Sequence, residues 1–319
     1  SGAATINPYD AIGKFLKAYY FNLMLQKYGE LPVIQALKGS ENTTPVYDSQ
    51  LDAFVQIMDW LEEANSNLAK LIGDKDATLA GDIYLGNNLE KWQQVVNSFT
   101  LRVLISLSKK ENESSLQVKD KFAAIVTDPG KYPLMEGLAS NLQFVYNEQF
   151  NNYPKTPGTL GFDVSRENIS STFLNLTTLL HDPRTFIAAT PAPSELQSGK
   201  TFQDFQAYIG ADVGADMGTI ATNATAGKYS YVNALRYYGS YDGSTVEPAI
   251  IIGYPELCFN VAEGINRGWV AGDAASWYFK GITASLEHLG ITENSSIPVG
   301  DIFQNVYGSV TVSISAYLN

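Results

Sequence analysis

Cysteine and histidine are almost absent from this chain, which removes the residue types that build disulfides and most zinc sites. Cys258 is the single cysteine, and because it lies in an apolar helical pattern we predict that it is buried. The two histidines, His181 and His288, are far apart in the sequence, and neither belongs to an HExxH-type motif. Asp212 and Asp216 are a weak signal for calcium, since no further oxygen ligands follow in pattern. We therefore expect no metal and no cofactor.

Basic residues are also scarce, and no run of them forms a positive patch. The chain has 319 residues, with 21 Lys and Arg against 33 Asp and Glu, and its net charge is −12. Such a chain repels phosphate backbones and anionic membrane surfaces. No apolar run approaches the roughly 20 residues that span a bilayer. We therefore expect no nucleic-acid partner and no membrane-spanning segment.

Tyrosine and uncharged polar residues are abundant. The chain contains 19 tyrosines, while charged residues make up only 17% of it. The polar surface must therefore rely on Asn, Ser, Thr and Gly, a chemistry that suits neutral, hydroxyl-rich ligands and also many secreted proteins without such a ligand. With 45% hydrophobic residues, the chain can bury a large core in one domain or in two closely packed lobes.

Hydrophobic spacing predicts long helices towards both ends of the chain. The first expected helix is capped by Asn7, opened by Pro8 and stopped by Gly29. All the expected helices repeat apolar residues at helical spacing, and they span residues 8–28, 48–73, 88–107, 115–126, 255–267 and 273–289. The last two form a pair closed by Gly268 and Gly290, which resembles a tetratricopeptide-type hairpin.

The pattern loosens between these helices. Residues 131–248 are rich in Gly, Pro, Asn, Thr and Tyr, and they contain one expected helix, around 167–180. The end of the chain is ambiguous, because Val310, Val312 and Ile314 alternate like a strand while residues 316–318 would continue a helix. The sequence alone therefore predicts helical hairpins on either side of an irregular lobe.

Five segments, in order along the chain, together resemble one known family. They are residues 18–23 with 28–32, residues 82–86 with 91–92 and 97–102, the Asp-Pro-Arg at 182–184, residues 254–269, and residues 274–290. The chain resembles the SusD/RagB family, and more narrowly its SusD-like branch of outer-membrane lipoproteins. One departure is Glu30, which stands where the family usually has Asp. The family's lipid-bearing N-terminal Cys and its C-terminal stretch with Trp and paired Arg are absent from this sequence.

The resemblance implies a mainly α fold, in which tetratricopeptide-like hairpins form a scaffold beside a loop-rich lobe. We expect a single SusD-like domain, with the scaffold at residues 1–128 and 249–319 and the ligand lobe at 129–248. We also expect the family's lipid-anchor and C-terminal segments to lie outside this sequence. Any membrane attachment would then come only through that anchor.

The resemblance further implies a surface-exposed outer-membrane lipoprotein that captures a nutrient, usually a glycan. It would pass this ligand to a SusC-like TonB-dependent transporter and would carry out no chemistry. Sugar rings pack on aromatic planes and offer hydroxyls to polar side chains, as in small-ligand sites generally. The expected ligand-binding residues are therefore the aromatic and polar residues of the lobe, namely Tyr146, Phe150, Tyr153, Tyr229, Tyr231, Asn233, Arg236, Tyr237, Tyr238 and Tyr241.

The motif residues themselves have a structural interpretation. Trp92 lies on the buried face of its expected helix, which favours core packing over sugar stacking. Asp182 is expected to cap the turn that Pro183 opens and to pair with Arg184. We expect helix-terminal or ion-pair roles for Glu256 and Glu263, rather than a carboxylate pair in a site.

Two other functions stay open. An all-helical glycoside hydrolase would need two carboxylates, which the many acidic residues allow, but no nucleophile-base motif or phosphate loop is present. A helical-repeat adaptor that binds only protein partners would share the same scaffold, and it predicts an apolar groove instead of a tyrosine-lined pocket. Peptides, glycans and glycoprotein fragments all remain possible ligands.

Overall fold

The computed structural model describes residues 6–147, 149–151, 153, 168–237 and 248–318. The chain divides into two compact units. Unit 1 comprises Ser1–Phe144 and Ile250–Ala284, and unit 2 comprises Val145–Ala249 and Ser285–Asn319. Residues 129–144 thus belong with the N-terminal helices, and residues 285–319 belong with the middle of the chain. No helix within the described ranges is both long and apolar enough to cross a membrane.

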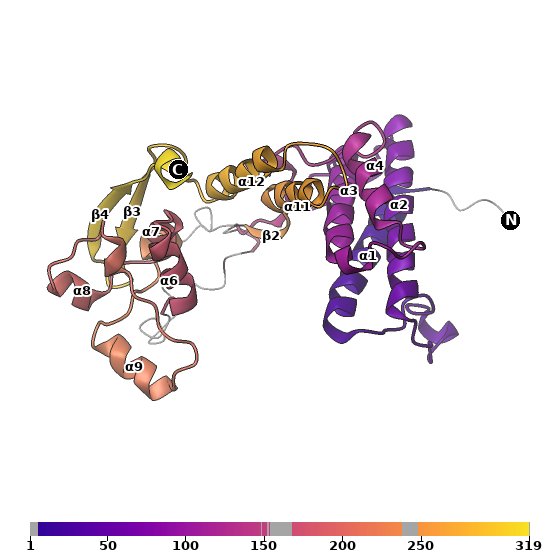
Figure 1. Cartoon of the computed structure of the whole chain (residues 1–319). Coiled ribbons are helices and arrows are strands. Elements are labelled where there is room, and N and C mark those ends of the chain that lie inside the picture. Colours follow the sequence, from indigo (N-terminus) through magenta and orange to yellow (C-terminus); the bar gives the residue numbers. More distant parts are fainter. Residues whose placement is uncertain (1–5, 148, 152, 154–167, 238–247, 319) are drawn as a thin grey trace. The chain divides into compact units, whose positions relative to one another are not determined.

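Unit 1 is built from long helices (Figure 1). Its elements are α1 (Pro8–Tyr28), η1 (Gly39–Glu41), α2 (Gln50–Gly73), α3 (Leu89–Ser106), η2 (Ser108–Lys110), α4 (Val118–Thr127), η3 (Leu138–Ser140), β1 (Leu142–Phe144), α11 (Tyr254–Asn266) and the first part of α12 (Ala274–His288). The short strand β1 pairs with β2 (Ala249–Ile252). Helix α1 packs against α2, α2 packs against α3, and α3 packs against both α4 and α11. The predicted mainly α fold is confirmed.

Capping residues set most of the helix starts. The Asn7 side chain accepts a hydrogen bond from the Asp10 amide, and Asn88 caps α3 in the same way, as expected. The predicted start of α2 was wrong by two residues, because Ser49 is its cap while Asp48 accepts bonds from the amides of the preceding loop. The predicted start of α4 was three residues early, since Gln117 has a left-handed backbone.

Aromatic rings fill the core of unit 1. Phe15 contacts Trp92 and Phe99 edge to face, at centroid distances of 5.9 and 5.7 Å. Trp92 is buried as predicted, and its indole N–H donates to Asp82 at 2.8 Å. Sequence periodicity predicts that burial, but it does not reveal the carboxylate that satisfies the indole.

Small residues allow close packing around α11 and α12. A Cβ on Gly264 would lie 2.1 Å from the Phe122 ring, and one on Gly281 would lie 2.8 Å from the Phe259 ring. The predicted Gly268 and Gly290 stops have positive φ angles of 73° and 76°. The tetratricopeptide-like hairpin expected at this position is confirmed.

Motif carboxylates of unit 1 form ion pairs. Glu256 pairs with Arg102, and the Arg102 guanidinium also donates to the Ile251 carbonyl. Glu263 pairs with Arg267 one helical turn away. These contacts confirm the structural interpretation of both glutamates. Cys258 is fully buried, also as predicted.

Unit 2 consists of short elements joined by long connections. They are α6 (Ser171–Leu179), α7 (Arg184–Ala188), α8 (Pro193–Gln197), η5 (Phe205–Ala207), α9 (Met217–Thr225), α10 (Ala234–Tyr237), β3 (Ser296–Gly300), β4 (Val306–Thr311) and α13 (Ile314–Leu318). The helix expected from residue 167 starts only at Ser171, after the cap Ser170. Strands β3 and β4 pair antiparallel, with Ile297 opposite Val310.

The ambiguous end of the chain is both strand and helix. Strand β4 ends at Thr311, and α13 starts at Ile314. Val310, Val312 and Ile314 are all buried, which explains why their alternation resembled one continuous strand. This arrangement places β4 and α13 one after the other along the wall of a cavity in unit 2.

Candidate functional site

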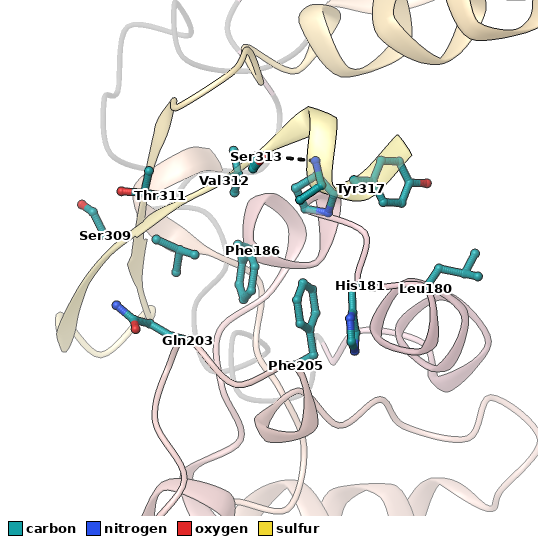
Figure 2. Close-up of a pocket in the computed structure, with 13 residues that line it drawn as sticks. Leu180, His181, Phe186, Gln203, Phe205, Ser309, Thr311, Val312, Ser313 and Tyr317 are labelled. Atoms are coloured by element: carbon teal, nitrogen blue, oxygen red, sulfur yellow. Dashed lines mark hydrogen bonds between the residues drawn. The ribbon is translucent and has the colours of Figure 1, made fainter. Parts of the chain in front are cut away.

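A cavity of about 740 Å³ lies within unit 2 (Figure 2). Three stretches of the chain contribute to it: the end of α6 with the start of α7, the segment around η5, and β4 with α13. The lining residues are Leu180, His181, Pro183, Phe186, Gln203, Phe205, Ser309, Val310, Thr311, Val312, Ser313, Ala316 and Tyr317. Its volume is in the range typical of small-molecule sites.

Stacked rings form one wall of the cavity. The His181 imidazole lies parallel to the Phe205 ring, with centroids 4.9 Å apart and planes 15° apart. Phe186 packs against the same Phe205 ring at 4.7 Å. Figure 2 shows the His181 and Phe205 rings side by side in the middle of the site. A ring wall of this kind presents the apolar surface on which a flat ligand or a sugar ring packs.

Polar side chains also line the cavity. Ser309 and Thr311 flank the buried Val310 on β4, so their hydroxyl groups share one face of the strand. Figure 2 shows Gln203 below Ser309, on the same side of the site. The side chains of Gln203, Ser309 and Thr311 are exposed and make no hydrogen bond to another residue within the described part of the chain. They can therefore donate to and accept from a bound ligand.

An ion pair lies next to the cavity lining. Asp182 is buried, accepts from the Arg184 amide at 2.9 Å, and forms an ion pair with the Arg184 guanidinium. The Tyr317 hydroxyl of α13 donates to the same carboxylate at 3.1 Å. Burial and the neighbouring Asp182 charge raise the pKa of Tyr317, so it stays a neutral hydrogen-bond donor. The predicted pairing of Asp182 with Arg184 is confirmed, whereas the cap position of α7 is Pro183 and Asp182 accepts from the amide of its first residue. The bond from Tyr317 ties α13 to the same carboxylate.

Three of the expected ligand residues share one turn. Tyr146 and Tyr153 meet edge to face, with ring centroids 5.2 Å apart. Between them, the Asn147 side chain accepts a bond from the Phe150 amide, and Asn147 also pairs through its backbone with Asn151. The Phe150 side chain is 82% exposed. This turn is therefore a second aromatic surface within unit 2.

Other expected ligand residues have structural contacts. Tyr231 is 6% exposed, donates to the Ala224 carbonyl and packs against Phe303. Asn233 is fully buried and donates to two backbone carbonyls, those of Phe186 and Pro298. These bonds occupy both hydrogens of the Asn233 amide, so we assign Tyr231 and Asn233 to the unit 2 core.

The remaining expected ligand residues are Tyr229, Arg236, Tyr237, Tyr238 and Tyr241. The Tyr229 hydroxyl accepts a bond from the Asn223 amide. Arg236 and Tyr237 lie on α10 and are partly buried. Tyr238 and Tyr241 fall outside the described residues. None of the expected residues that the structure describes lines the cavity.

Sequence reasoning therefore missed the cavity. Its lining comes from three stretches that lie between Leu180 and Tyr317, 137 residues apart at the extremes, and no local spacing links Phe205 to Tyr317. Two signals nevertheless point to it. The Asp-Pro-Arg motif borders the cavity through Pro183, and the alternation of Val310 and Val312 implies polar neighbours on a shared face.

The two aspartates that gave the weak calcium signal, Asp212 and Asp216, have structural roles. Asp216 caps α9 by accepting bonds from the Gly218 and Thr219 amides. The Asp212 carboxylate accepts from the Gly214 amide at 2.9 Å. Across the ranges that the structure describes, no group of three or more His, Cys, Asp or Glu residues could hold a metal ion.

The comparisons with known proteins agree on one family. The model of the SusD-like family, described as starch-binding and associating with the outer membrane, matches residues 2–304. A SusD homolog from Bacteroides fragilis is 32% identical with a TM-score of 0.79, and the match covers 92% of this chain and 60% of that one. A protein from Bacteroides vulgatus, suggested to be an outer-membrane protein involved in nutrient binding, is 33% identical with a TM-score of 0.77 over 90% of this chain.

More distant structures share the fold. A chitin-binding protein is 20% identical with a TM-score of 0.69, and the match covers 97% of this chain and 60% of that protein. No curated protein sequence matches the chain. The chain spans 60% and 61% of the lengths of the two Bacteroides proteins.

Proposed function

This chain belongs to the SusD-like family, and we propose on that premise that it binds a nutrient, in particular a glycan, at the outer face of the outer membrane. Association with the outer membrane follows from the family description, as predicted. Members of the family are binding proteins, so we propose capture of the ligand without catalysis. The protein would then hold the ligand close to the membrane until it is taken up.

The observation that carries this proposal is the composition of the unit 2 cavity. The His181 and Phe205 rings stack in the lining, and Gln203, Ser309 and Thr311 contribute polar groups to the same cavity. A sugar ring has apolar C–H faces and polar edges, so it can use both kinds of lining group. A purely apolar ligand would leave the polar lining groups without partners.

We propose the turn at residues 146–153 as a second contact for a long ligand. Tyr146, Phe150 and Tyr153 supply ring surface there, and the exposure of Phe150 leaves its ring open to solvent. Tyr229, Arg236, Tyr237, Tyr238 and Tyr241 remain further candidates on the same unit. An extended glycan would gain affinity by binding at two places.

The proposed partner is a SusC-like TonB-dependent transporter. The connection between α1 and α2 in unit 1 supports a protein contact, because its large apolar side chains are unusually exposed. They are Ile34, Leu37, Val46 and Tyr47, each 47% to 73% exposed. Exposed apolar residues concentrated in one segment are typical of an interaction surface. Loss of transporter co-purification after Leu37→Ser with Tyr47→Ser would support this assignment.

Calorimetry against a panel of soluble oligosaccharides tests the capture role. The double variant Gln203→Ala/Thr311→Ala should weaken binding by about tenfold, because each lost hydrogen bond contributes about 0.5–1.5 kcal/mol. Thr225→Ala, an exposed threonine on α9, is the matched control and should bind like the parent. Binding that is unchanged in the double variant would refute the cavity, and release of shorter sugars by the pure protein would refute a non-catalytic role.

A further inference from the structure

Among the residues that the structure describes, the lining of the unit 2 cavity includes no Asp, Glu, Lys or Arg side chain. Its polar groups are hydroxyls, one amide and the His181 imidazole. A site that selects an anionic ligand normally supplies arginine or lysine for bidentate or point-charge contacts. The described lining offers hydroxyl, amide and imidazole groups instead.

The cation nearest to the lining along the chain is already neutralised. Arg184 follows the lining residue Pro183, and its guanidinium donates to both carboxylate oxygens of Asp182, from Nε at 3.0 and 2.9 Å. The hydrogen bond to Asp182 raises the pKa of Arg184, so the guanidinium stays charged. Lys200 is likewise paired with Glu195. An anionic ligand would have to compete with carboxylates that the protein already provides.

Two further carboxylates lie next to the lining residues. Asp204 sits between Gln203 and Phe205, and its carboxylate accepts from the Thr201 amide and hydroxyl at 2.7 and 3.0 Å. Glu293 accepts from the Ser313 hydroxyl at 2.9 Å and from the Ser315 amide at 3.0 Å. Hydrogen bonds of this kind lower the pKa of both groups, so both are anionic at neutral pH.

We propose that this cavity selects uncharged, hydroxyl-rich ligands and rejects acidic ones, such as uronates and sulfated sugars. The inference rests on the proposed function and specifies the class of ligand. The hydroxyls of a neutral ligand can form hydrogen bonds with Gln203, Ser309 and Thr311, whereas an anion meets the field of Asp204 and Glu293 with no Lys or Arg among the described lining residues to pair with it. The net charge of −12 on the whole chain acts in the same direction.

Matched pairs of ligands test the selection. Calorimetry at low salt would compare neutral oligosaccharides of glucose, galactose and mannose with oligogalacturonate, oligomannuronate and dextran sulfate. We expect the tightest neutral ligand to bind at least about tenfold more strongly than any acidic one, a ratio that should shrink as salt screens the carboxylates.

Adding a positive charge to the lining provides the positive control. Thr311→Lys places a cation in the lining, and it should raise affinity for the acidic ligands by about fivefold or more at low salt. Val306→Lys adds the same charge to the same strand outside the lining, roughly 17 Å away at strand spacing, and should change little. Ser309→Trp fills the cavity from an exposed strand position and should abolish binding of every ligand that uses it.

The outcomes distinguish a failure of the proposed ligand selection from a failure of the proposed ligand capture. Neutral binding that Ser309→Trp abolishes, together with weak acidic binding that Thr311→Lys strengthens, is the expected result. If an acidic ligand binds as tightly as its neutral counterpart and Ser309→Trp abolishes both, capture stands and selection is overturned. If no ligand binds, or if Ser309→Trp leaves binding intact, the proposed capture at this cavity is overturned together with the selection.

Discussion

Unit 1 and unit 2 are stabilised by different kinds of contact. Unit 1 packs long helices around rings such as Phe15, Trp92 and Phe99. In unit 2, buried polar side chains hold short elements together, and Asn233 alone donates to carbonyls on two separate segments. Apolar packing tolerates approximate partners, whereas a buried amide requires particular ones. The contacts between the short elements of unit 2, where the candidate site lies, therefore depend on specific hydrogen bonds.

Asp301 illustrates the second kind of contact. Its buried carboxylate accepts bonds from the amides of Phe303 and Asn305 and from the Tyr307 hydroxyl at 2.7 Å. One side chain thus closes the turn between β3 and β4. Burial, together with the hydrogen bond to Asp301, raises the pKa of Tyr307. The turn therefore keeps a protonated phenol at any physiological pH.

The largest effect is expected from a steric change in unit 1. Gly264→Ala would place a Cβ 2.1 Å from the Phe122 ring, and overpacking of this kind should lower the free energy of unfolding by about 3 kcal/mol. Gly13→Ala is the matched control, because no atom lies within 4 Å of its Cβ position on α1. Higher helix propensity should make the control more stable by about 0.5–1 kcal/mol. Equal denaturant midpoints for the two variants would contradict the close packing.

A polar change in unit 2 should have the next largest effect. Asp182→Ala removes the partner of Arg184 and of Tyr317, and we expect a loss of about 2 kcal/mol, since hydrogen bonds to charged groups contribute about 1.5–3 kcal/mol. Tyr317→Phe removes only one of these bonds and should cost about 1 kcal/mol. A Tyr317→Phe variant as unstable as Asp182→Ala would contradict a central role for the carboxylate.

These two kinds of variant also test the predicted single domain. If the units unfold together, Gly264→Ala and Asp182→Ala should both lower the midpoint of one calorimetric transition. If the units unfold separately, each substitution should shift its own transition and leave the other in place. The second result would replace the single domain with two.

The sequence predicts unit 1 far better than unit 2, because the helices of unit 1 follow from local patterns while the site in unit 2 depends on contacts between distant residues. Helical periodicity and caps such as Asn7 and Asn88 are local, so the order of the long helices can be derived from neighbours in the chain. The cavity depends on contacts such as Tyr317 to Asp182, which are 135 residues apart. Tyrosine content identified unit 2 as rich in aromatic residues, but it could not separate the buried Tyr231 from the exposed Phe150.

A smaller effect is expected from pH. Hydrogen bonds from the Ser315 amide and the Ser313 hydroxyl lower the pKa of Glu293 below its unfolded value of about 4.3. Its contribution to stability is therefore present above about pH 4.3 and is lost as the pH falls through the lower folded value. Glu293→Gln should reduce the melting temperature at pH 7, and the difference from the parent should shrink as the pH falls below about 4.3. A difference that stays constant as the pH falls would contradict this linkage.

The smallest effect concerns the turn at residues 146–153. Phe150→Ala should weaken binding of a long oligosaccharide by about fivefold, because an aromatic contact contributes about 1 kcal/mol, and it should not change stability. Met217→Ala is the matched control, since both side chains are 82% exposed on unit 2. Equal affinities of the two variants, measured by calorimetry, would remove the turn from the proposed site.

Hydrogen exchange with and without a bound neutral oligosaccharide tests ligand capture by unit 2 most directly. The account predicts slower amide exchange in β4, in α13 and in the segment 201–205, with little change in α1 to α4. Protection confined to the long helices of unit 1, with β4 unaffected, would contradict it.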